Sequence, residues 1–220
     1  MHPDESQECR TQPVTDFDSP LFELCLGVLE QSIAANEQLS RSRLRKLLSG
    51  DDYRLYALRG RNEVAGAASL YFSSSTPFVV LDYLAIHPER RNQGLGSVFF
   101  RELTDAVRRE NPEANWLILE VDDEGEKLDG KYVENRRRIE FYRRLGAQLL
   151  ANVPYRFPSP SGVAVPMRLM VYRLQAGATL SASDLRAAIE DSFRQVHGRR
   201  DEDELLVWFR AHMPDVLILE

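Results

Sequence analysis

The chain has 220 residues and a formal net charge of −6, with 43% hydrophobic and 28% charged residues. These fractions are typical of a globular protein long enough for one buried core and an appendage. The acidic balance argues against nucleic-acid binding by bulk attraction, and no apolar run approaches the about 20 residues that cross a membrane. Two cysteines, Cys9 and Cys25, are too few for a disulfide framework, and the polar N-terminus lacks a signal-peptide core. We therefore expect two reduced thiols in a cytoplasmic protein.

The first half of the chain predicts strands and helices in a regular order. Residues 1–13 are expected to be a disordered lead. The elements that follow are a short strand at 14–15, helices from Ser19-Pro20 and over 40–48, a hairpin of strands 54–59 and 64–72, and a strand at 79–86. Ser19-Pro20 is a good helix start because a capping residue precedes proline at the first helical position.

The second half continues with alternating elements and ends in an extension. The expected elements are a helix at 97–110, a buried strand at 116–121, an acidic loop at 122–130, a helix at 135–145, and strands at 148–153 and 167–174. The connection at 154–166 contains Pro-Ser-Pro-Ser-Gly, which is equally typical of a lid-type loop and of surface decoration.

Residues 176–220 predict two more helices, over about 182–196 and 201–211, and an apolar tail at 216–219 that can add a strand. The candidates for a buried face here are Leu185, Ile189, Phe193, Trp208 and Phe209. They are too few for an independent core, so this extension should dock on the main domain or on a second subunit of a homodimer.

The segment from Leu84 to Ser97 is the most informative part of the chain. An apolar strand with Leu84-x-Ile86-x-Pro88 runs into a basic loop containing Gly94 and Gly96, and a helix follows. Glycine lets a ligand approach the backbone closely, and a helix N-terminus presents unpaired N–H groups at the positive end of the dipole. This arrangement favours binding of a phosphate.

The spacing Arg91-x-x-Gly94-x-Gly96 resembles the pyrophosphate loop of the GNAT superfamily of acyl-CoA-dependent N-acetyltransferases. A second segment, with Asn135, Phe141-Tyr142 and Leu145-Gly146-Ala147, resembles another motif of that family. It departs from the motif at Arg138, where alanine is usual, and at Ala147, where phenylalanine is usual. The resemblance covers residues 14–175 and implies the GNAT fold, an α/β (α+β) fold with a central mixed, mostly antiparallel sheet flanked by helices.

The resemblance also implies the cofactor contacts. The acyl donor would be acetyl-CoA, with no metal. The pantetheine arm would lie along Leu84, Ala85 and Ile86. The pyrophosphate would contact Arg91, Asn92, Gln93, Gly94, Leu95, Gly96 and Ser97. Asn135 and Tyr142 of the second motif would complete the cofactor site.

Three side chains are candidates for catalysis. By resemblance, Tyr142 would protonate the leaving thiolate, although a tyrosine packed against the sheet is the alternative. Asp82 shares a strand face with Leu84 and Ile86. The resemblance implies that an acid at this strand position lies near the acceptor amine, where it could bind an ammonium group or take its proton; an ion pair with an arginine is the alternative. Glu120 is a charged residue in an otherwise apolar strand, where a charge needs a partner or a role. It could be the alternative base, or it could form a salt bridge at the rim of the sheet.

The carboxylate cluster after Glu120, from Asp122 to Glu126, predicts a solvated loop better than a metal site. No histidine or cysteine joins it, and the spacing is not that of a Ca²⁺ loop.

The leading hypothesis is an acetyl-CoA-dependent N-acetyltransferase that transfers the acyl group directly to a primary amine of a small molecule. Direct transfer is favoured because neither cysteine matches a nucleophile position. A protein amine, on lysine or an N-terminus, is open as the acceptor. A non-catalytic acyl-CoA-binding sensor is the alternative from another class.

Overall fold

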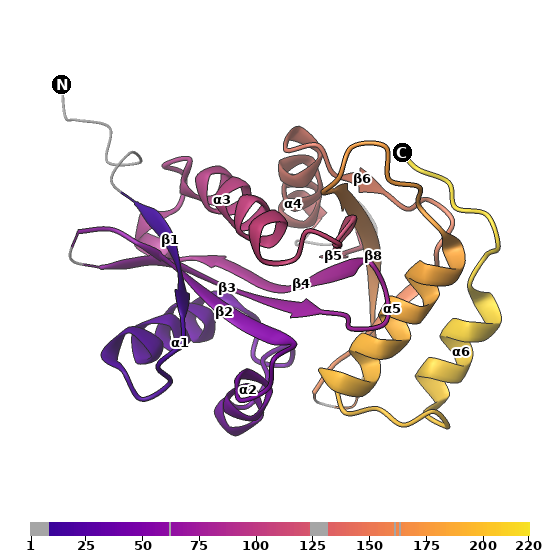
Figure 1. Cartoon of the computed structure of the whole chain (residues 1–220), viewed down its shortest axis with the longest axis horizontal. Coiled ribbons are helices and arrows are strands. Elements are labelled where there is room, and N and C mark those ends of the chain that lie inside the picture. The colour runs from indigo at the N-terminus through magenta and orange to yellow at the C-terminus, as the bar shows by residue number, and fades with distance from the viewer. Residues whose placement is uncertain (1–8, 62, 124–131, 161, 163) are drawn as a thin grey trace. The chain divides into compact units, whose positions relative to one another are not determined.

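The computed structural model describes residues 9–61, 63–123, 132–160, 162 and 164–220. The chain forms two compact units, one containing the residues up to Phe72 and Leu81–Pro112, the other Ser73–Val80 and Glu113–Glu220. The first unit holds β1 (Arg10–Val14), α1 (Pro20–Ser32), α2 (Arg41–Leu48), β2 (Tyr53–Arg59), β3 (Val64–Phe72), most of β4 (Phe78–Ile86), the 3-10 turn η2 (Pro88–Arg90) and α3 (Leu95–Glu110) (Figure 1). The second unit holds the start of β4, β5 (Trp116–Asp122), α4 (Tyr132–Arg144), β6 (Gln148–Leu149), β7 (Tyr155–Pro158), β8 (Ala164–Arg173), α5 (Ala182–Gln195) and α6 (Glu204–His212).

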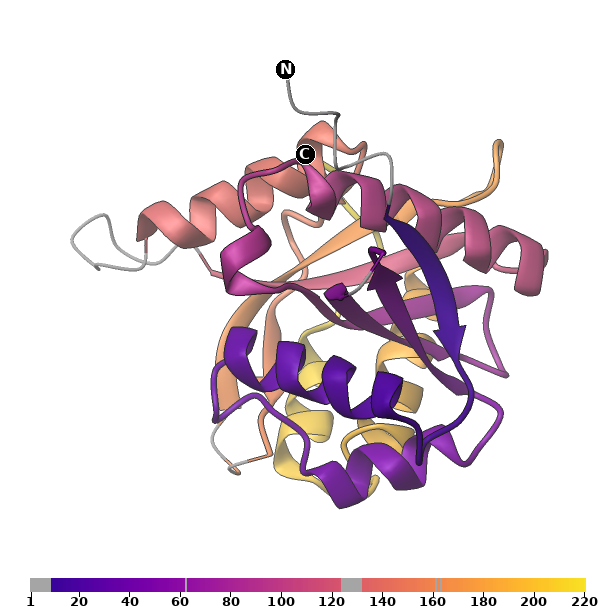
Figure 2. The same ribbon diagram turned by 90° about the vertical axis from the view of Figure 1, so that its left-hand side faces the viewer.

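In the first unit, β1, β2 and β3 pair antiparallel, with α1 and α2 on one face and α3 on the other (Figure 2). The two helix starts that the sequence predicts are confirmed, because the side chains of Ser19 and Ser40 accept hydrogen bonds from the N–H groups of Phe22 and Arg43. Gly66 on β3 is required by a close approach: a Cβ there would lie 2.9 Å from the carbonyl oxygen of Ala85. A larger residue at this position would push β4 away from β3.

In the second unit, β8 is paired on both edges. It pairs antiparallel with β5 on one side, and with β6 and β7 on the other. The helix α4 covers one face of these strands, while α5 and α6 cover the other (Figure 2). The predicted fold class, α/β with a mostly antiparallel sheet flanked by helices, is confirmed.

Three segments differ from the sequence prediction. Part of the expected disordered lead, residues 10–13, belongs to β1, whose polar residues gain backbone partners on β2. Residues 1–8 lie outside the described part. The expected loop at 154–166 contains β7, which pairs with the start of β8. Conversely, the strand expected at 148–153 is reduced to the two residues of β6. Local composition does not predict β1 or β7, because the stability of these two strands comes from pairing with strands distant in the sequence.

The C-terminal tail adds a strand-like pairing to the second unit, as the sequence indicates. The N–H groups of Leu149 and Glu220 donate to each other's carbonyl oxygens at 3.0 and 2.9 Å, and Leu150 forms an isolated bridge with Leu219. These bonds tie the end of the chain to the segment that begins at β6.

The extension 176–220 buries most of its large apolar side chains. Leu185, Ile189, Phe193 and Phe209 are each at most 1% exposed. Trp208 stays partly exposed, stacked on His212 and under the guanidinium of Arg156, whose Cζ lies 4.4 Å from the indole centroid. In the described residues, no helix is long and apolar enough to span a bilayer.

Truncation after Gln175 should therefore lower the melting temperature and promote self-association. It removes the buried side chains of the extension, with Leu185, Ile189, Phe193 and Phe209 among them, and uncovers their partners. Full burial of each large apolar side chain stabilises by roughly 1.5–3 kcal/mol. Thermal melts and sedimentation of residues 1–175 beside the full chain check this. A fragment that is monomeric and as heat-resistant as the full chain would show that the extension is a free appendage.

Candidate active site

One face of β4 is open in the first unit. Asp82, Leu84 and Ile86 are partly exposed, whereas Leu81, Tyr83 and Ala85 are buried. Because side chains alternate along a strand, one face packs in the core and the other is accessible. The carbonyl oxygen of Ile86 already accepts from Arg91 Nε at 3.2 Å and from Ser32 Oγ at 3.3 Å. A ligand along this strand would share that carbonyl with two side chains.

The loop after β4 has the backbone of an anion site. Asn92 and Gly94 have φ of +62° and +77°, and Gln93 between them does not have a positive φ. Such alternation turns successive N–H groups towards one point. Gly94 is the N-cap of α3, and a Cβ built on it would meet no atom within 4 Å. The space in front of the helix N-terminus is therefore open.

The side chains of the loop divide into structural and ligand-facing groups. Leu95 is 1% exposed, so its side chain belongs to the core and only its N–H can reach a ligand. Arg90 pairs with Glu63 and donates from Nε to Gln93 at 3.0 Å. The positive charge of Arg90 is thus partly neutralised, which the sequence did not predict, while Arg91 is exposed at the loop.

Asp82 is held by a hydrogen-bond chain across three strands. The Tyr53 hydroxyl on β2 donates to Asp82 Oδ2, and it lies 2.8 Å from Ser69 Oγ on β3. A phenol has one proton, so Ser69 donates to Tyr53, which donates to Asp82. Burial raises the pKa of Asp82 from 3.8 to about 6, and the Tyr53 hydroxyl acts in the opposite direction. Asp82 therefore changes charge near pH 6.

Tyr53 and Ser69 were missed by the sequence analysis. Both lie in apolar strands and match no motif; only the pairing of β2 with β3 brings them to the same face. The partner of Asp82 seen in the structure is this tyrosine, rather than the arginine of the alternative hypothesis.

The other predicted residues lie in the second unit. Tyr142 on α4 is 7% exposed, and its ring lies 5.0 Å from that of Phe141. Burial raises the pKa of Tyr142 to about 12 despite the nearby Arg138, so the phenol is protonated at neutral pH. Asn135 Nδ2 donates to the carbonyl oxygen of Asp123 at 2.8 Å. The motif residue Asn135 thus ties α4 to the segment that follows β5.

The departure from the family motif at Arg138 has a local partner. Arg138 Nη1 lies 2.5 Å from Asp122 Oδ2, at the end of β5. The extra charge on α4 is therefore compensated within the unit. The rest of the expected acidic loop, 124–130, lies outside the described residues.

Glu120 on β5 accepts a hydrogen bond from the hydroxyl of Tyr155 on β7. Tyr155 is 3% exposed, whereas Glu120 is partly exposed. A carboxylate that is fixed on one side and accessible on the other can contact a ligand.

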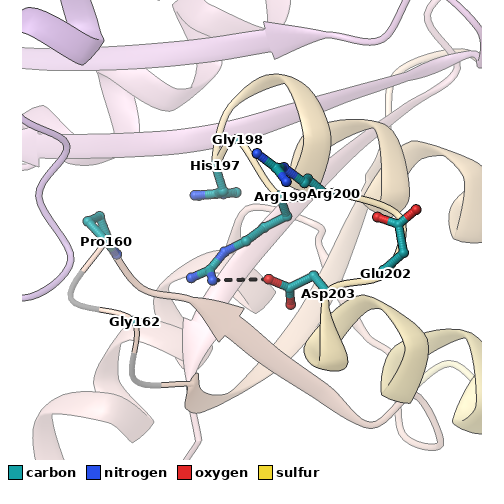
Figure 3. Close-up of a pocket in the computed structure, with 8 residues that line it drawn as sticks. All are labelled: Pro160, Gly162, His197, Gly198, Arg199, Arg200, Glu202 and Asp203. Carbon is teal, nitrogen blue, oxygen red and sulfur yellow. Dashed lines mark hydrogen bonds and ion pairs between the residues drawn. The ribbon is translucent and has the colours of Figure 1, made fainter.

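The described residues also line a cavity of about 530 Å³, formed by the α5–α6 connection of the extension and by the segment after β7 (Figure 3). Its lining residues are Pro160, Gly162, His197, Gly198, Arg199, Arg200, Glu202 and Asp203. Arg199 lies 3.2 Å from Asp203 and donates to the carbonyl oxygen of Ser159 at 3.1 Å. These contacts hold the α5–α6 connection against the segment after β7, which is a structural role.

Neither cysteine is placed to act as a nucleophile. Cys9 and Cys25 are buried and form no disulfide within the described part of the chain, and burial raises the pKa of the Cys25 thiol to about 12. Among the residues that the structure describes, no group of three or more His, Cys, Asp or Glu could hold a metal ion.

Comparison with known proteins agrees with this arrangement. The sequence model of the Acetyltransferase (GNAT) family matches residues 28–147. The Bacillus subtilis protein YjbC, named as an acetyltransferase, is 25% identical over 133 residues, which are 60% of this chain and 62% of YjbC. The chain thus spans less than two thirds of that relative's length.

Solved structures share the fold. A GNAT-family acetyltransferase from Bacteroides thetaiotaomicron superposes with a TM-score of 0.70 at 22% identity, over 87% of this chain and 99% of that one. An aminoglycoside 6'-N-acetyltransferase complexed with coenzyme A has a TM-score of 0.54 at 15% identity, over 77% of this chain and 99% of that one. The family match covers more than half of the chain, and this chain is a member of the GNAT family of acetyltransferases.

Proposed function

We propose that this acetyltransferase moves the acetyl group of acetyl-CoA directly to a primary amine of a small molecule. The observation that carries the proposal is the open face of β4, which leads from Asp82 through Leu84 and Ile86 to the anion loop 91–97. One strand thus offers a carboxylate for a cation at its middle and leads at its C-terminal end to the loop with phosphate-binding N–H groups. Figure 1 shows β4 and α3, which the loop joins.

The proposed reaction needs no covalent enzyme intermediate. Asp82, ionised above pH about 6, takes a proton from the bound ammonium and leaves a neutral amine. The amine nitrogen attacks the thioester carbonyl carbon, and the C–S bond breaks. The sulfur receives its proton from Tyr142, whose phenol is neutral at this pH. The second proton lost by the nitrogen as the amide forms returns the Tyr142 phenolate to its neutral form, and Asp82 releases the first proton to solvent.

The small-molecule acceptor is supported by charge. The chain has a net charge of −6, and the open strand face carries a carboxylate that suits a cationic amine. The aminoglycoside enzyme with the same fold acts on a small amine by its name. The acceptor class can be tested by comparing kcat/KM for small polyamines and amino sugars with kcat/KM for peptides bearing lysine or a free N-terminus. Higher values for the peptides would reverse the assignment.

Tyr142→Phe should lower kcat about tenfold or more and leave the affinity for acetyl-CoA nearly unchanged, because a leaving-group acid acts mainly in the transition state. Steady-state kinetics and equilibrium binding of acetyl-CoA separate the two effects.

Tyr172→Phe is the matched control, since it also removes a phenol hydroxyl in the second unit but lies outside the family motif. If Tyr142→Phe kept the full kcat at saturating substrates, Tyr142 would be a packing residue.

A further inference from the structure

The helices of the C-terminal extension reach a candidate active-site carboxylate through one tyrosine. We propose that α5 and α6 position Glu120 through Tyr155, so that the extension forms part of the acceptor-amine site. This inference rests on the proposed function, in which a primary amine is the acceptor. Asp82 is the base in that reaction, and Glu120 is assigned here to binding of the amine. It gives the extension, which lies outside the region matched by the family, a role in recognition of the acceptor.

The register of β8 explains how the two residues meet. Glu120 on β5 is opposite Leu169, and Tyr155 on β7 is opposite Met167. Directly opposed residues point to the same face, as do residues two apart on one strand. Glu120 and Tyr155 therefore flank β8 on the same face, and the phenol reaches across that strand to the carboxylate.

The ring of Tyr155 is held by the extension. It lies 6.0 Å from the ring of Phe193 on α5 and 6.2 Å from that of Phe209 on α6, the latter at 89°. The three rings are at most 3% exposed. The pair with Phe209 is edge-to-face and the pair with Phe193 is tilted, and an edge-to-face aromatic pair stabilises beyond its burial. The direction of the phenol is thus set by side chains from both helices.

The two helices are fixed to each other by charge. Glu190 on α5 accepts from Arg194 at 2.8 Å and from Arg210 on α6 at 2.9 Å. Asp201 between the helices accepts from the same two arginines at 2.8 and 2.7 Å. A network of this kind holds its members better than an isolated surface pair. Figure 1 shows α5 and α6 side by side.

A buried tyrosine needs a partner for its hydroxyl, so the contact with Glu120 alone is also compatible with a purely structural role. A double-mutant cycle distinguishes the two. Tyr155→Phe keeps the ring and removes the hydroxyl. If Tyr155 acts through Glu120, kcat/KM for the amine should fall about tenfold, the loss of one hydrogen bond to a charged group. The same substitution should have almost no further effect in the Glu120→Gln background.

Phe209→Leu should cause a smaller loss in kcat/KM for the amine, since it loosens the support of Tyr155. Val207→Ser on the same helix is the control, because Val207 is 50% exposed and should leave the kinetics unchanged. Acetyl-CoA affinity should be unaffected in every variant. Additive losses in the double mutant, or an unchanged kcat/KM in Glu120→Gln, would overturn the inference.

A readout without turnover separates this inference from the proposed function. The ¹³C carboxyl resonance of Glu120, assigned by its loss in Glu120→Gln, should move in Tyr155→Phe and Phe209→Leu but not in Val207→Ser. An unmoved resonance would refute the positioning role even in an active enzyme. Absence of amine turnover in the wild type, with the resonance moving as expected, would refute the proposed function and the acceptor role while leaving the positional link established.

Discussion

Gly94→Asp should abolish binding of CoA and acetyl-CoA. The substitution puts a carboxylate at the N-cap of α3, in the open space where the proposed pyrophosphate sits. The new carboxylate would repel the negatively charged pyrophosphate. It would also accept hydrogen bonds from the N–H groups at the start of α3, which would otherwise bind the ligand. Isothermal titration calorimetry and the ligand-induced rise in melting temperature measure the loss.

The matched control for Gly94→Asp is Gly94→Asn. Gly94 has a φ of +77°, so any side chain there is strained, but asparagine tolerates this region and has the shape of aspartate without its charge. We expect Gly94→Asn to weaken CoA binding and Gly94→Asp to remove it. Undiminished binding in Gly94→Asp would show that the loop is an ordinary junction between a strand and a helix.

Asp82→Asn should remove most of the amine transfer and the acid limb of the pH profile. The pKa of Asp82 is raised by burial to about 6, so the wild-type kcat/KM should fall about tenfold per pH unit below that value. Tyr53→Phe is the companion variant. The Tyr53 hydroxyl lowers the pKa of Asp82, so its loss should move the acid limb to higher pH. An acid limb that stays in place in Asp82→Asn would mean that another group titrates.

The same carboxylate should reduce stability at neutral pH. Below pH about 4, Asp82 is neutral in both the folded and the unfolded chain. Between its unfolded value of 3.8 and its folded value of about 6, the unfolded chain ionises first, so the free energy of unfolding falls as pH rises. Asp82→Asn should therefore be more stable than the wild type above pH 6, with the gain disappearing towards pH 4. Denaturant unfolding at several pH values tests this, and Leu84→Ala on the same face controls for general effects on the strand.

Local signals in the sequence predicted the parts of the fold that depend on local chemistry. Ser19 and Ser40 cap the helices they were expected to start, because a side chain that accepts from the third N–H is a property of a few consecutive residues. The helix start at Gly94 is also a local feature, because glycine adopts the φ of +77° found there without steric cost. By contrast, β1 and β7 contain polar residues and prolines and become strands only through their partners.

The residues that hold the candidate carboxylates could not be predicted for a related reason. Tyr53 reaches Asp82 only through the register of β2 and β3, and Tyr155 reaches Glu120 only across β8. A one-residue shift in either register would turn the tyrosine to the opposite face. Periodicity assigns a residue to a face of its own strand, but strand register decides which residue it meets.

Release of free thiol from acetyl-CoA, measured with and without a panel of small amines, tests the central claim most directly. The wild type should release thiol only when an amine is present, with one acetylated amine formed for each thiol, and Gly94→Asp should release none. Binding of acetyl-CoA without amine-dependent thiol release or acetylated product would contradict the proposed function and identify the chain as a module that binds acyl-CoA without turnover.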